Sequence, residues 1–377
     1  MSDLRNAPPD EVALLGDDEA PPSSAFRSES YSALIRRRFR RSRTGVVGAV
    51  LVAFVLLCTV LADFIAPYEP GARDTTNQNS PPQLPHLSLD GLYTNQLAVE
   101  LDPATFQPVF VADPTKRCYL RPFARSWPYG FLGLALDRHL LGVELGCPAH
   151  LLGTDGLGRD MLSRILVGSR LTLAMACLVV AISVAIGTSI GLVSGFYGGL
   201  ADDWLQRLTE LVLALPELPL YLAIVAIIPR NTDPLQVFFS LAAILSIIRW
   251  ASLAREVRGK TLALRSTEYV RAAEAVGASV PRIVFRHVLP NVMSHVVVVI
   301  TLMIPAIVLA ESFLSFLGIG VQPPLVSWGL LLNAGKDLQN LGSYPWMLLP
   351  VIAILITVLG FNMLGDGLRD AIDPHAD

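Results

Sequence analysis

The chain has 377 residues, of which 52% are hydrophobic and 16% are charged. Soluble domains carry about 25% charged residues, so this composition excludes a soluble globular protein and indicates a membrane protein that crosses the bilayer several times. The net charge of −3 gives no reason to expect a nucleic-acid partner.

The N-terminal part divides into an acidic tail, residues 1–30, and a basic segment with the first span, residues 31–67. The tail is rich in Pro and Ser and lacks apolar periodicity, which predicts disorder. Residues 44–66 are apolar and long enough to cross about 30 Å of hydrocarbon. Six arginines precede this run, at Arg36, Arg37, Arg38, Arg40, Arg41 and Arg43. They could bind nucleic acid, but their place beside a span favours a cytoplasmic N-terminus.

Residues 68–150 are polar and rich in proline, with no clear alternation of apolar and polar positions. This pattern predicts a large irregular insertion after the first span. A cytoplasmic N-terminus places that insertion on the external side of the membrane. Cys118 and Cys147 both lie in it. An oxidising external compartment permits a disulfide between them, and two unpaired thiols are the alternative.

The run HLLGTDGLGRDMLSRILVGSRLTL, residues 150–173, joins a turn-rich loop to an apolar segment. Its glycines do not form a phosphate-binding loop, because no GK[ST] follows them. Asp160 precedes apolar positions at helical spacing, which predicts an amphipathic helix on the external surface. The second span should then cover residues 171–193, where Gly187 and Gly191 have the GxxxG spacing that allows close helix packing.

The third and fourth spans are expected at residues 205–228 and 235–252. Glu217 lies near the middle of the third span, where an ionised side chain must face protein or water. It is therefore one candidate for the lining of a translocation path. The alternative is structural: Glu217 pairs with a basic group, or it caps backbone groups that Pro216 and Pro219 leave free.

The stretch between the fourth and fifth spans, residues 255–291, is too charged to cross a bilayer, and its basic excess places it in the cytoplasm. It predicts two short helices. Gly277 can take the left-handed conformation that ends the first helix. Ser279 is a candidate N-cap for the second helix, with Pro281 in its first turn, and Pro290 is expected to close the unit.

The fifth and sixth spans are expected at residues 292–316 and 346–364. Between them, the segment ESFLSFLGIGVQPPLVSW contains glycines and prolines that break a helix, which predicts a re-entrant or interfacial external segment. Glu311, near the outer end of the fifth span, is the second candidate for the translocation path. The run GFNMLGDGLRDAIDP predicts a solvated C-terminal helix in which Asp366 can contact Arg369 or Asp370.

The helix–Gly–helix stretch resembles the EAA loop of ABC-importer permeases, the element that docks on the ATPase subunit. The leading Glu of that family is replaced by Arg271, and Glu274 supplies an acid one helical turn later. An ordinary amphipathic helix pair is the alternative. The resemblance implies an ATPase-coupling set made of Arg271, Ala272, Ala273, Glu274, Gly277, Ile283, Pro290 and Asn291.

Three other runs resemble one class of these permeases, the dipeptide/oligopeptide class. They are the GTD-x-x-GRD-x-x-SR segment, the SFLGIG segment with its following PP and SW, and the C-terminal run. The matching charged positions are Asp155, Arg159, Asp160, Arg164, Asp366, Arg369 and Asp370. The chain is thereby identified as similar to a C-type permease subunit, over residues 36–67 and about 150–374.

This resemblance implies an all-α membrane protein with the six spans of the type I importer permease fold and a large external insertion between helices 1 and 2. It implies a bacterial cytoplasmic (inner) membrane location with both termini in the cytoplasm. The implied partners are a homologous permease, two ABC ATPase subunits that bind ATP and Mg, an extracytoplasmic substrate-binding protein and membrane lipid. No cofactor or metal is expected in this chain, and no nucleic acid.

The implied function is import of dipeptides or oligopeptides by alternating access, with no enzymatic activity in this chain. Nickel, glutathione or a peptide antibiotic are alternative substrates within the family. Outside it, the alternatives are a proton-coupled secondary transporter, suggested by Glu217, and a membrane-bound enzyme or receptor that works through the insertion. The sequence contains no nucleophile elbow, HExxH, Walker A or kinase signature.

Overall fold

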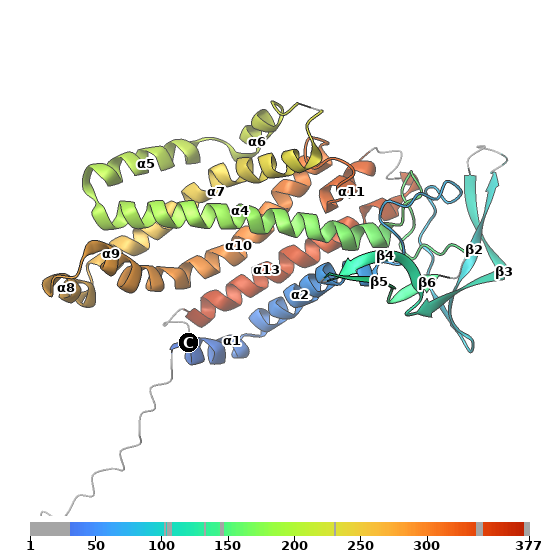
Figure 1. Cartoon of the computed structure of the whole chain (residues 1–377), viewed down its shortest axis with the longest axis horizontal. Coiled ribbons are helices and arrows are strands. Elements are labelled where there is room, and N and C mark those ends of the chain that lie inside the picture. Colours follow the sequence, from blue (N-terminus) through green and yellow to red (C-terminus); the bar gives the residue numbers. More distant parts are fainter. Residues whose placement is uncertain are drawn as a thin grey trace, which may run out of the picture.

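A computed structural model describes residues 31–372, except 102, 104–107, 132, 144–146, 230 and 337–341. The tail expected in residues 1–30 therefore lies outside the described residues. Within the described part, five helices are long and apolar enough to span a membrane, or six if one bent pair counts as a span. The helices form one elongated bundle, with the strands at one end and α8 (Glu268–Ala275) and α9 (Val280–Ile283) at the other (Figure 1).

The long apolar helices are α2 (Arg43–Val60), α4 (Met161–Tyr197), α7 (Pro234–Arg265), α10 (Leu289–Phe316) and α13 (Pro350–Ile372). The shorter helices are α1 (Tyr31–Arg41), α3 (Ala62–Ile65), α5 (Gly199–Ala214), α6 (Glu217–Val225) and α11 (Trp328–Ala334). A π-helical turn, Val284–Val288, joins α9 to α10, and a 3-10 turn, Pro345–Leu348, precedes α13.

Helix α4 packs along α7 at the centre of the bundle, and glycines allow the close approach. A Cβ atom added to Gly187 would lie 2.7 Å from the backbone oxygen of Trp250, and one added to Gly191 would lie 2.6 Å from that of Ala254. Real Cβ contacts are essentially never this short. The packing role predicted for the GxxxG spacing is therefore confirmed.

The amphipathic surface helix expected before the second span does not exist as a separate element. Helix α4 runs without a break from Met161 to Tyr197. Asp160 starts it, because its carboxylate accepts a hydrogen bond of 2.8 Å from the backbone N–H of Ser163. No Pro lies within it, and it ends only at Gly198, which has a φ of 67°.

The third span expected at residues 205–228 is broken into α5 and α6, whose axes differ by 83°. The break lies at Leu215, which has an extended backbone with ψ of 131°. A residue that precedes proline is pushed out of the helical region, and Pro216 has this effect on Leu215. The segment predicted as the third span is therefore a bent helix pair, which counts as one span if the two helices are taken together.

We expected an irregular insertion, but its described residues contain six strands. They are β1 (His86–Ser88), β2 (Gly91–Leu101), β3 (Pro108–Pro122), β4 (Arg125–Phe131), β5 (Leu134–Arg138) and β6 (Leu141–Val143). Antiparallel pairing gives one sheet of order β1-β2-β3-β6 and a separate β4-β5 hairpin. Prolines within β3 and β4 and the exposure of β5 on both faces hid the alternation in the sequence.

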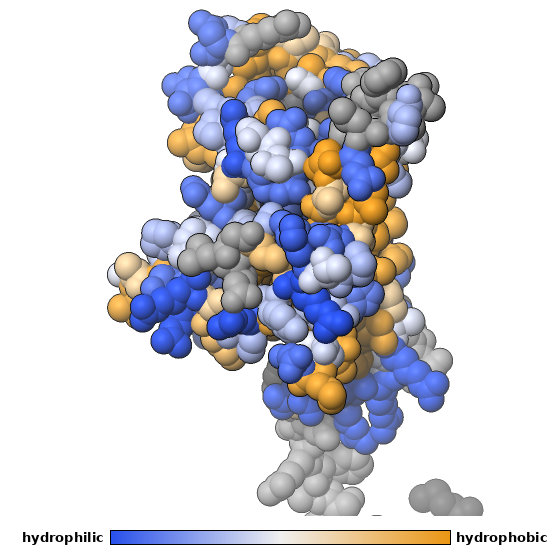
Figure 2. Space-filling model, turned by 90° about the vertical axis from the view of Figure 1, so that its right-hand side faces the viewer, coloured by the Kyte–Doolittle hydropathy of each residue, from blue (hydrophilic) through white to orange (hydrophobic). Residues whose placement is uncertain are grey.

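The strand-bearing end presents a largely hydrophilic surface with smaller hydrophobic patches between the polar areas (Figure 2). This surface contrasts with the helices, where the outward faces of α2, α5 and α13 carry many exposed apolar side chains. Such a division fits a bundle surrounded by lipid and an end surrounded by water.

The segment after α10, predicted to be re-entrant or interfacial, packs against α4 through Trp328. Trp328 is only 2% exposed. Its backbone N–H donates to the hydroxyl of Thr172 at 3.1 Å, and its indole N–H donates to the carbonyl of Ile165 at 2.9 Å. These two bonds fix the start of α11 against α4 and bury the irregular backbone in protein.

Candidate functional site

The connection between α7 and α10 has the predicted helix–Gly–helix form. Gly277 has a φ of 79°, and its N–H donates to the carbonyl of Glu274 at 2.9 Å. Ser279 occupies the N-cap position of α9 with Pro281 in the first turn, although its side chain makes no capping hydrogen bond. We call residues 268–283, which comprise α8, Gly277 and α9, the connecting hairpin.

Buried apolar side chains anchor the connecting hairpin to the bundle. Val270 and Val288 are 0% exposed and Ile283 is 1% exposed. Ile283, which the resemblance placed in the ATPase-coupling set, is therefore buried and packs the hairpin against the bundle instead of forming its exposed surface. Ala273 is half-buried. The members of the set that form the exposed surface are Arg271, Ala272, Glu274 and Gly277, together with Pro290 and Asn291 beside them.

We expected Pro290 to close the two-helix unit, but it does not. It lies in the first turn of α10, and the π-helical turn carries α9 directly into that helix. The side-chain amide of Asn291 donates to the carbonyl of His287 at 2.7 Å and to the hydroxyl of Tyr269 at 3.3 Å. The bond to Tyr269 ties α10 to α8. The hairpin is thus continuous with α10, and only Ser266 and Thr267 separate it from α7.

Helix α7 is joined to α5 by a bidentate ion pair. Arg258 Nε donates to Asp202 Oδ1 and Arg258 Nη2 donates to Asp202 Oδ2, both at 2.6 Å. The hydroxyl of Ser194 on α4 also donates to Asp202, and Gln206 Nε2 donates to that hydroxyl at 2.9 Å. Bidentate charged pairs fix geometry more strictly than single hydrogen bonds. This cluster therefore holds α4, α5 and α7 together near the hairpin end.

Helix α7 is also joined to α6, on the other side of the bend. Arg249 pairs with Glu217 through Nη2 and Oε1, and the hydroxyl of Tyr221 donates to the same Oε1 at 3.0 Å. The side chains of Arg249 and Glu217 remain 24% and 36% exposed. Glu217 was predicted either to line a translocation path or to pair with a basic group. Arg249 is the basic partner that the second interpretation requires.

Glu311, the second path candidate, is enclosed. It is 1% exposed, and its carboxylate accepts a hydrogen bond of 2.8 Å from the hydroxyl of Ser315. A cavity of about 570 Å³ lies between the end of α6, the start of α7 and the segment after α10. Residues such as Val225, Val237 and Gln322 line this cavity, and Glu311 does not.

The charged residues of the GTD-x-x-GRD run form a compact ion-pair cluster at the base of the insertion. Asp155 is 2% exposed, accepts a 2.8 Å hydrogen bond from Arg159 Nε and pairs with Arg164. Burial raises the pKa of the Asp155 carboxyl, but the Arg164 guanidinium and the hydrogen bonds from Arg159 lower it by more, so this pKa lies below its usual value. Asp160 caps α4 and binds His150 Nδ1 at 3.0 Å.

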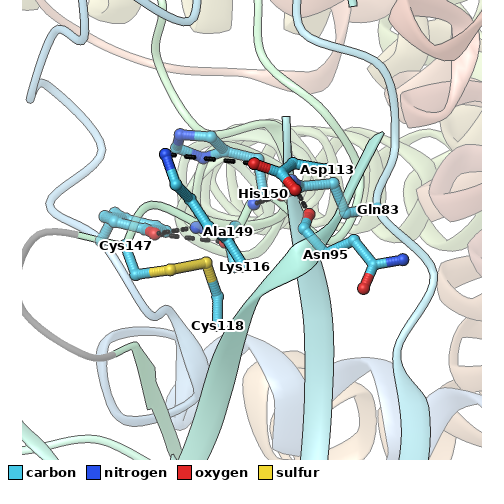
Figure 3. Close-up of a disulfide and its surroundings, with 9 residues drawn as sticks. Gln83, Asn95, Asp113, Lys116, Cys118, Cys147, Ala149 and His150 are labelled. Carbon is cyan, nitrogen blue, oxygen red and sulfur yellow. Dashed lines mark hydrogen bonds and ion pairs between the residues drawn. A yellow bond between two sulfur atoms is a disulfide. The ribbon is translucent and has the colours of Figure 1, made fainter. Parts of the chain in front are cut away.

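The structure joins Cys118 and Cys147 in a disulfide with a Cα–Cα distance of 5.4 Å, in agreement with the prediction. It lies beside Ala149 and His150 (Figure 3). The backbone N–H of His150 donates to Gln83 Oε1 at 2.5 Å, and Gln83 Nε2 donates to the carbonyl of Asn95 at 3.1 Å. The disulfide and these hydrogen bonds attach the sheet to the ion-pair cluster at the start of α4.

The charged residues of the C-terminal run do not form the expected contact. Asp366, Arg369 and Asp370 are exposed, and within the described part of the chain Asp366 makes no ion pair with Arg369. The glycines of this run are the packed positions instead. Gly367 meets Gly45 of α2 so closely that neither position has room for a side chain.

Sequence reasoning missed Arg258 as the partner of Asp202 and Arg249 as the partner of Glu217. The residues of the first pair are 56 positions apart, and the four come from three helices whose packing is set by many apolar contacts. A charge inside an apolar segment was the available signal. It singled out Glu217 but could not name its partner.

Comparison with known proteins places this architecture in a family. Residues 187–377 match the family described as "Binding-protein-dependent transport system inner membrane component". Residues 30–82 match the family described as "N-terminal TM domain of oligopeptide transport permease C". A structure titled "Inward facing conformations of the MetNI methionine ABC transporter" aligns with 56% of this chain and 98% of its own, at 18% identity and a TM-score of 0.46.

Curated relatives are similar over most of their length. The oligopeptide transport system permease protein OppC of Bacillus subtilis (strain 168) is 39% identical over 60% of this chain and 72% of its own. The glutathione transport system permease protein GsiD of Pectobacterium atrosepticum is 42% identical over 60% and 73%. The dipeptide transport system permease protein DppC of Haemophilus influenzae is 31% identical over 89% and 92%. The chain belongs to the family of binding-protein-dependent transport system inner membrane components, and it is a multi-pass permease subunit of an ABC importer rather than an enzyme.

Proposed function

We propose that this permease subunit moves dipeptides or oligopeptides into the bacterial cytoplasm by alternating access, driven by ATP that partner ATPase subunits hydrolyse. One observation carries the mechanism: the exposed connecting hairpin is anchored to the bundle and continuous with α10. The substrate class rests on relatives named as oligopeptide and dipeptide permeases. The glutathione permease, at 42% identity, supports glutathione, itself a small peptide, as the second candidate.

The orientation follows from charge. The arginine-rich helix α1 and the connecting hairpin lie toward the same end of the bundle, opposite the strands (Figure 1). Basic clusters stay in the cytoplasm, so this end and the N-terminus face inward and the insertion faces outward. In this arrangement the C-terminal end of α13 is also cytoplasmic, and the insertion is available to an extracytoplasmic binding protein.

The exposed hairpin residues Arg271, Ala272, Glu274 and Gly277 form the surface on which an ATPase subunit docks, with Pro290 and Asn291 at its edge. ATP and Mg bind to those ATPases and not to this chain. A homologous permease pairs with this chain to complete the passage. Movement of the docked ATPases displaces the hairpin, and with it the ends of α7 and α10.

The two ion pairs of α7 transmit that displacement to the broken span. Arg258 of α7 is ion-paired with Asp202 of α5, and Arg249 of α7 is ion-paired with Glu217 of α6, so both helices are attached to α7. Because α5 and α6 meet at the bend beside Pro216, a shift of α7 changes the angle between them. Coupling of this kind requires an element with two states whose balance a distant ligand shifts. The bend is that element, and Glu217 lies beside the path that it opens.

Reconstitution of the complete importer in proteoliposomes tests this function. We expect uptake of labelled peptides that needs the binding protein and internal ATP and persists when an uncoupler dissipates the proton gradient. Uptake that survives removal of ATP but stops with the uncoupler would instead establish a proton-coupled transporter. Parallel assays with glutathione and with Ni²⁺ decide between the substrate classes.

A further inference from the structure

We propose that α1 and the neighbouring face of α2 form a binding site for anionic phospholipid, with the headgroup on the arginines of α1 and the acyl chains along α2. This site goes beyond transport, and its occupancy can be measured without any transport. The site combines a cationic surface and an apolar surface on consecutive helices.

The position of α1 is fixed by packing. Ser42 separates α1 from α2, and its hydroxyl accepts a hydrogen bond of 3.2 Å from the backbone N–H of Gly45, which starts α2 afresh. The ring of Phe39 lies against Gly45 and Gly367, where an added Cβ would come within 2.9 and 3.3 Å of it. Helix α1 therefore lies against the ends of α2 and α13 and does not lengthen the span.

The outward face of α1 is strongly cationic. Arg36, Arg40 and Arg41 are exposed, and together with Ala33 and Arg37 they line a surface groove of about 430 Å³. None of these three exposed arginines has an acidic partner among the residues that the structure describes. Arg43 adds a further exposed charge in the first turn of α2, where the helix dipole opposes a cation. An anionic ligand would relieve this crowding of like charges.

The apolar part of the site identifies the ligand as a lipid. The exposed apolar side chains of α2 that follow the arginines include Val46, Val47, Val50, Phe54 and Leu57. They form a strip that suits acyl chains, whereas an acidic peptide or a nucleic acid would leave it uncovered. Leu34, which is 36% exposed, places a further apolar group on α1 itself. Clusters of four or more arginines next to a span are typical of anionic lipid recognition.

The composition of residues 1–30 identifies a competitor for this site. Residues 1–30 contain seven acidic and two basic side chains and precede α1 directly. This segment could compete for the arginines, so the experiment includes a chain that lacks residues 2–30.

The test uses the purified chain in nanodiscs of phosphatidylcholine with 30% phosphatidylglycerol, and native mass spectrometry counts the phosphatidylglycerol that it retains. The triple variant R36Q/R40Q/R41Q removes three charges, R36K/R40K/R41K keeps them, and K116Q/R125Q/R138Q removes three exposed charges of the insertion as a matched control. A basic group near an anionic surface changes binding about fivefold, so three change it roughly 100-fold.

We expect the glutamine variant to lose preferential retention of phosphatidylglycerol, and the lysine variant and the insertion control to keep it. Equal retention by wild type and glutamine variant, with both monodisperse and equally helical, would overturn the proposal. So would a wild-type chain that shows preference only after residues 2–30 are deleted, because the acidic segment would then be the occupant.

Discussion

Arg258 donates two hydrogen bonds to Asp202, from Nε to Oδ1 and from Nη2 to Oδ2, each 2.6 Å long. This pair joins the helix that leads into the connecting hairpin to the first turn of α5. Charged bidentate bonds each contribute about 1.5–3 kcal/mol, several times the thermal energy, so α5 follows α7 when the hairpin moves. The relationship gives the proposed coupling a physical connection.

The first prediction concerns this pair. Asp202→Ala should lower peptide uptake per ATP hydrolysed at least tenfold while ATPase activity persists, because α7 then moves without α5. The exchange D202R/R258D should restore part of the uptake. Asp203→Asn is the matched control, since Asp203 is exposed and adjacent. An unchanged ratio of uptake to hydrolysis in the Asp202 variant would show that the pair does not transmit the movement.

The second prediction concerns the other side of the bend. Glu217→Gln and Arg249→Gln should each reduce thermal stability and uptake, and the double variant should be little worse than either single variant. Groups in direct contact show such non-additivity, typically by about 0.5–3 kcal/mol. A double-mutant cycle tests this, with melting curves of the purified chain and uptake by the reconstituted importer as the two measurements. Strictly additive effects would refute a functional Glu217–Arg249 pair.

The third prediction concerns Gly277, whose backbone φ of 79° is rarely adopted by residues that have a Cβ atom. Nothing lies within 4 Å of a Cβ added there, so Gly277→Val acts through the backbone and not through a clash. The strain is about 1–2 kcal/mol, enough to shift the hairpin away from its docking geometry. Substrate-stimulated ATPase and uptake should both fall, and Ala275→Val, at an exposed helical position, should leave them intact. Wild-type values for the Gly277 variant would contradict a role in coupling.

The fourth prediction follows from the low pKa of Asp155. A carboxyl whose pKa is lower in the folded than in the unfolded state contributes stability above the unfolded value, about 3.9 for Asp, and loses it as the pH falls through the folded value. The stability difference between wild type and Asp155→Asn should therefore be constant from pH 7 to 5 and shrink below about pH 4. Removing the partner of buried Arg164 should cost about 3–5 kcal/mol at neutral pH. A difference that does not change with pH would contradict the assignment.

The fifth prediction concerns the disulfide, which closes a loop with a sequence separation of 29. A loop of this length corresponds to about 3.5 kcal/mol of stabilisation in the chain-entropy description. The variant C118S/C147S should make the insertion more sensitive to limited proteolysis and leave the helices protected. C58S/C177S removes the two free cysteines and serves as the control. Mass spectrometry of non-reduced wild-type peptides must also recover the linked pair, and its absence would disprove the bridge.

The sequence was informative where local chemistry decides the structure. Gly277 was recognisable because a left-handed residue between two helical runs calls for glycine, and Gly187 and Gly191 because their spacing is that of a packed interface. The motifs sufficed for the family, which the comparisons confirm. The anchors Val270 and Ile283 were not separable from contact residues, since both faces of a short hairpin contain apolar side chains.

The remaining features depend on contacts between distant residues or on strands that lack a buried face. In β5, all five positions are exposed, so no alternation of polarity could reveal the strand. Pro216 was visible, but whether it kinks a span or breaks it depends on the protein around it. The ion pairs of α7 join residues from separate helices, and a single sequence contains no measure of which helices pack together.

The orientation and role of the connecting hairpin are tested most directly by cysteine labelling at Ala272, an exposed position of α8. In the background C58S/C177S, Ala272→Cys should react with a membrane-impermeant maleimide only in inside-out vesicles, and bound ATPase subunits should block the reaction. Leu89→Cys in the fully exposed part of the insertion should react only in right-side-out vesicles. Labelling of Ala272→Cys from the external side, or equal labelling with and without the ATPases, would contradict the account.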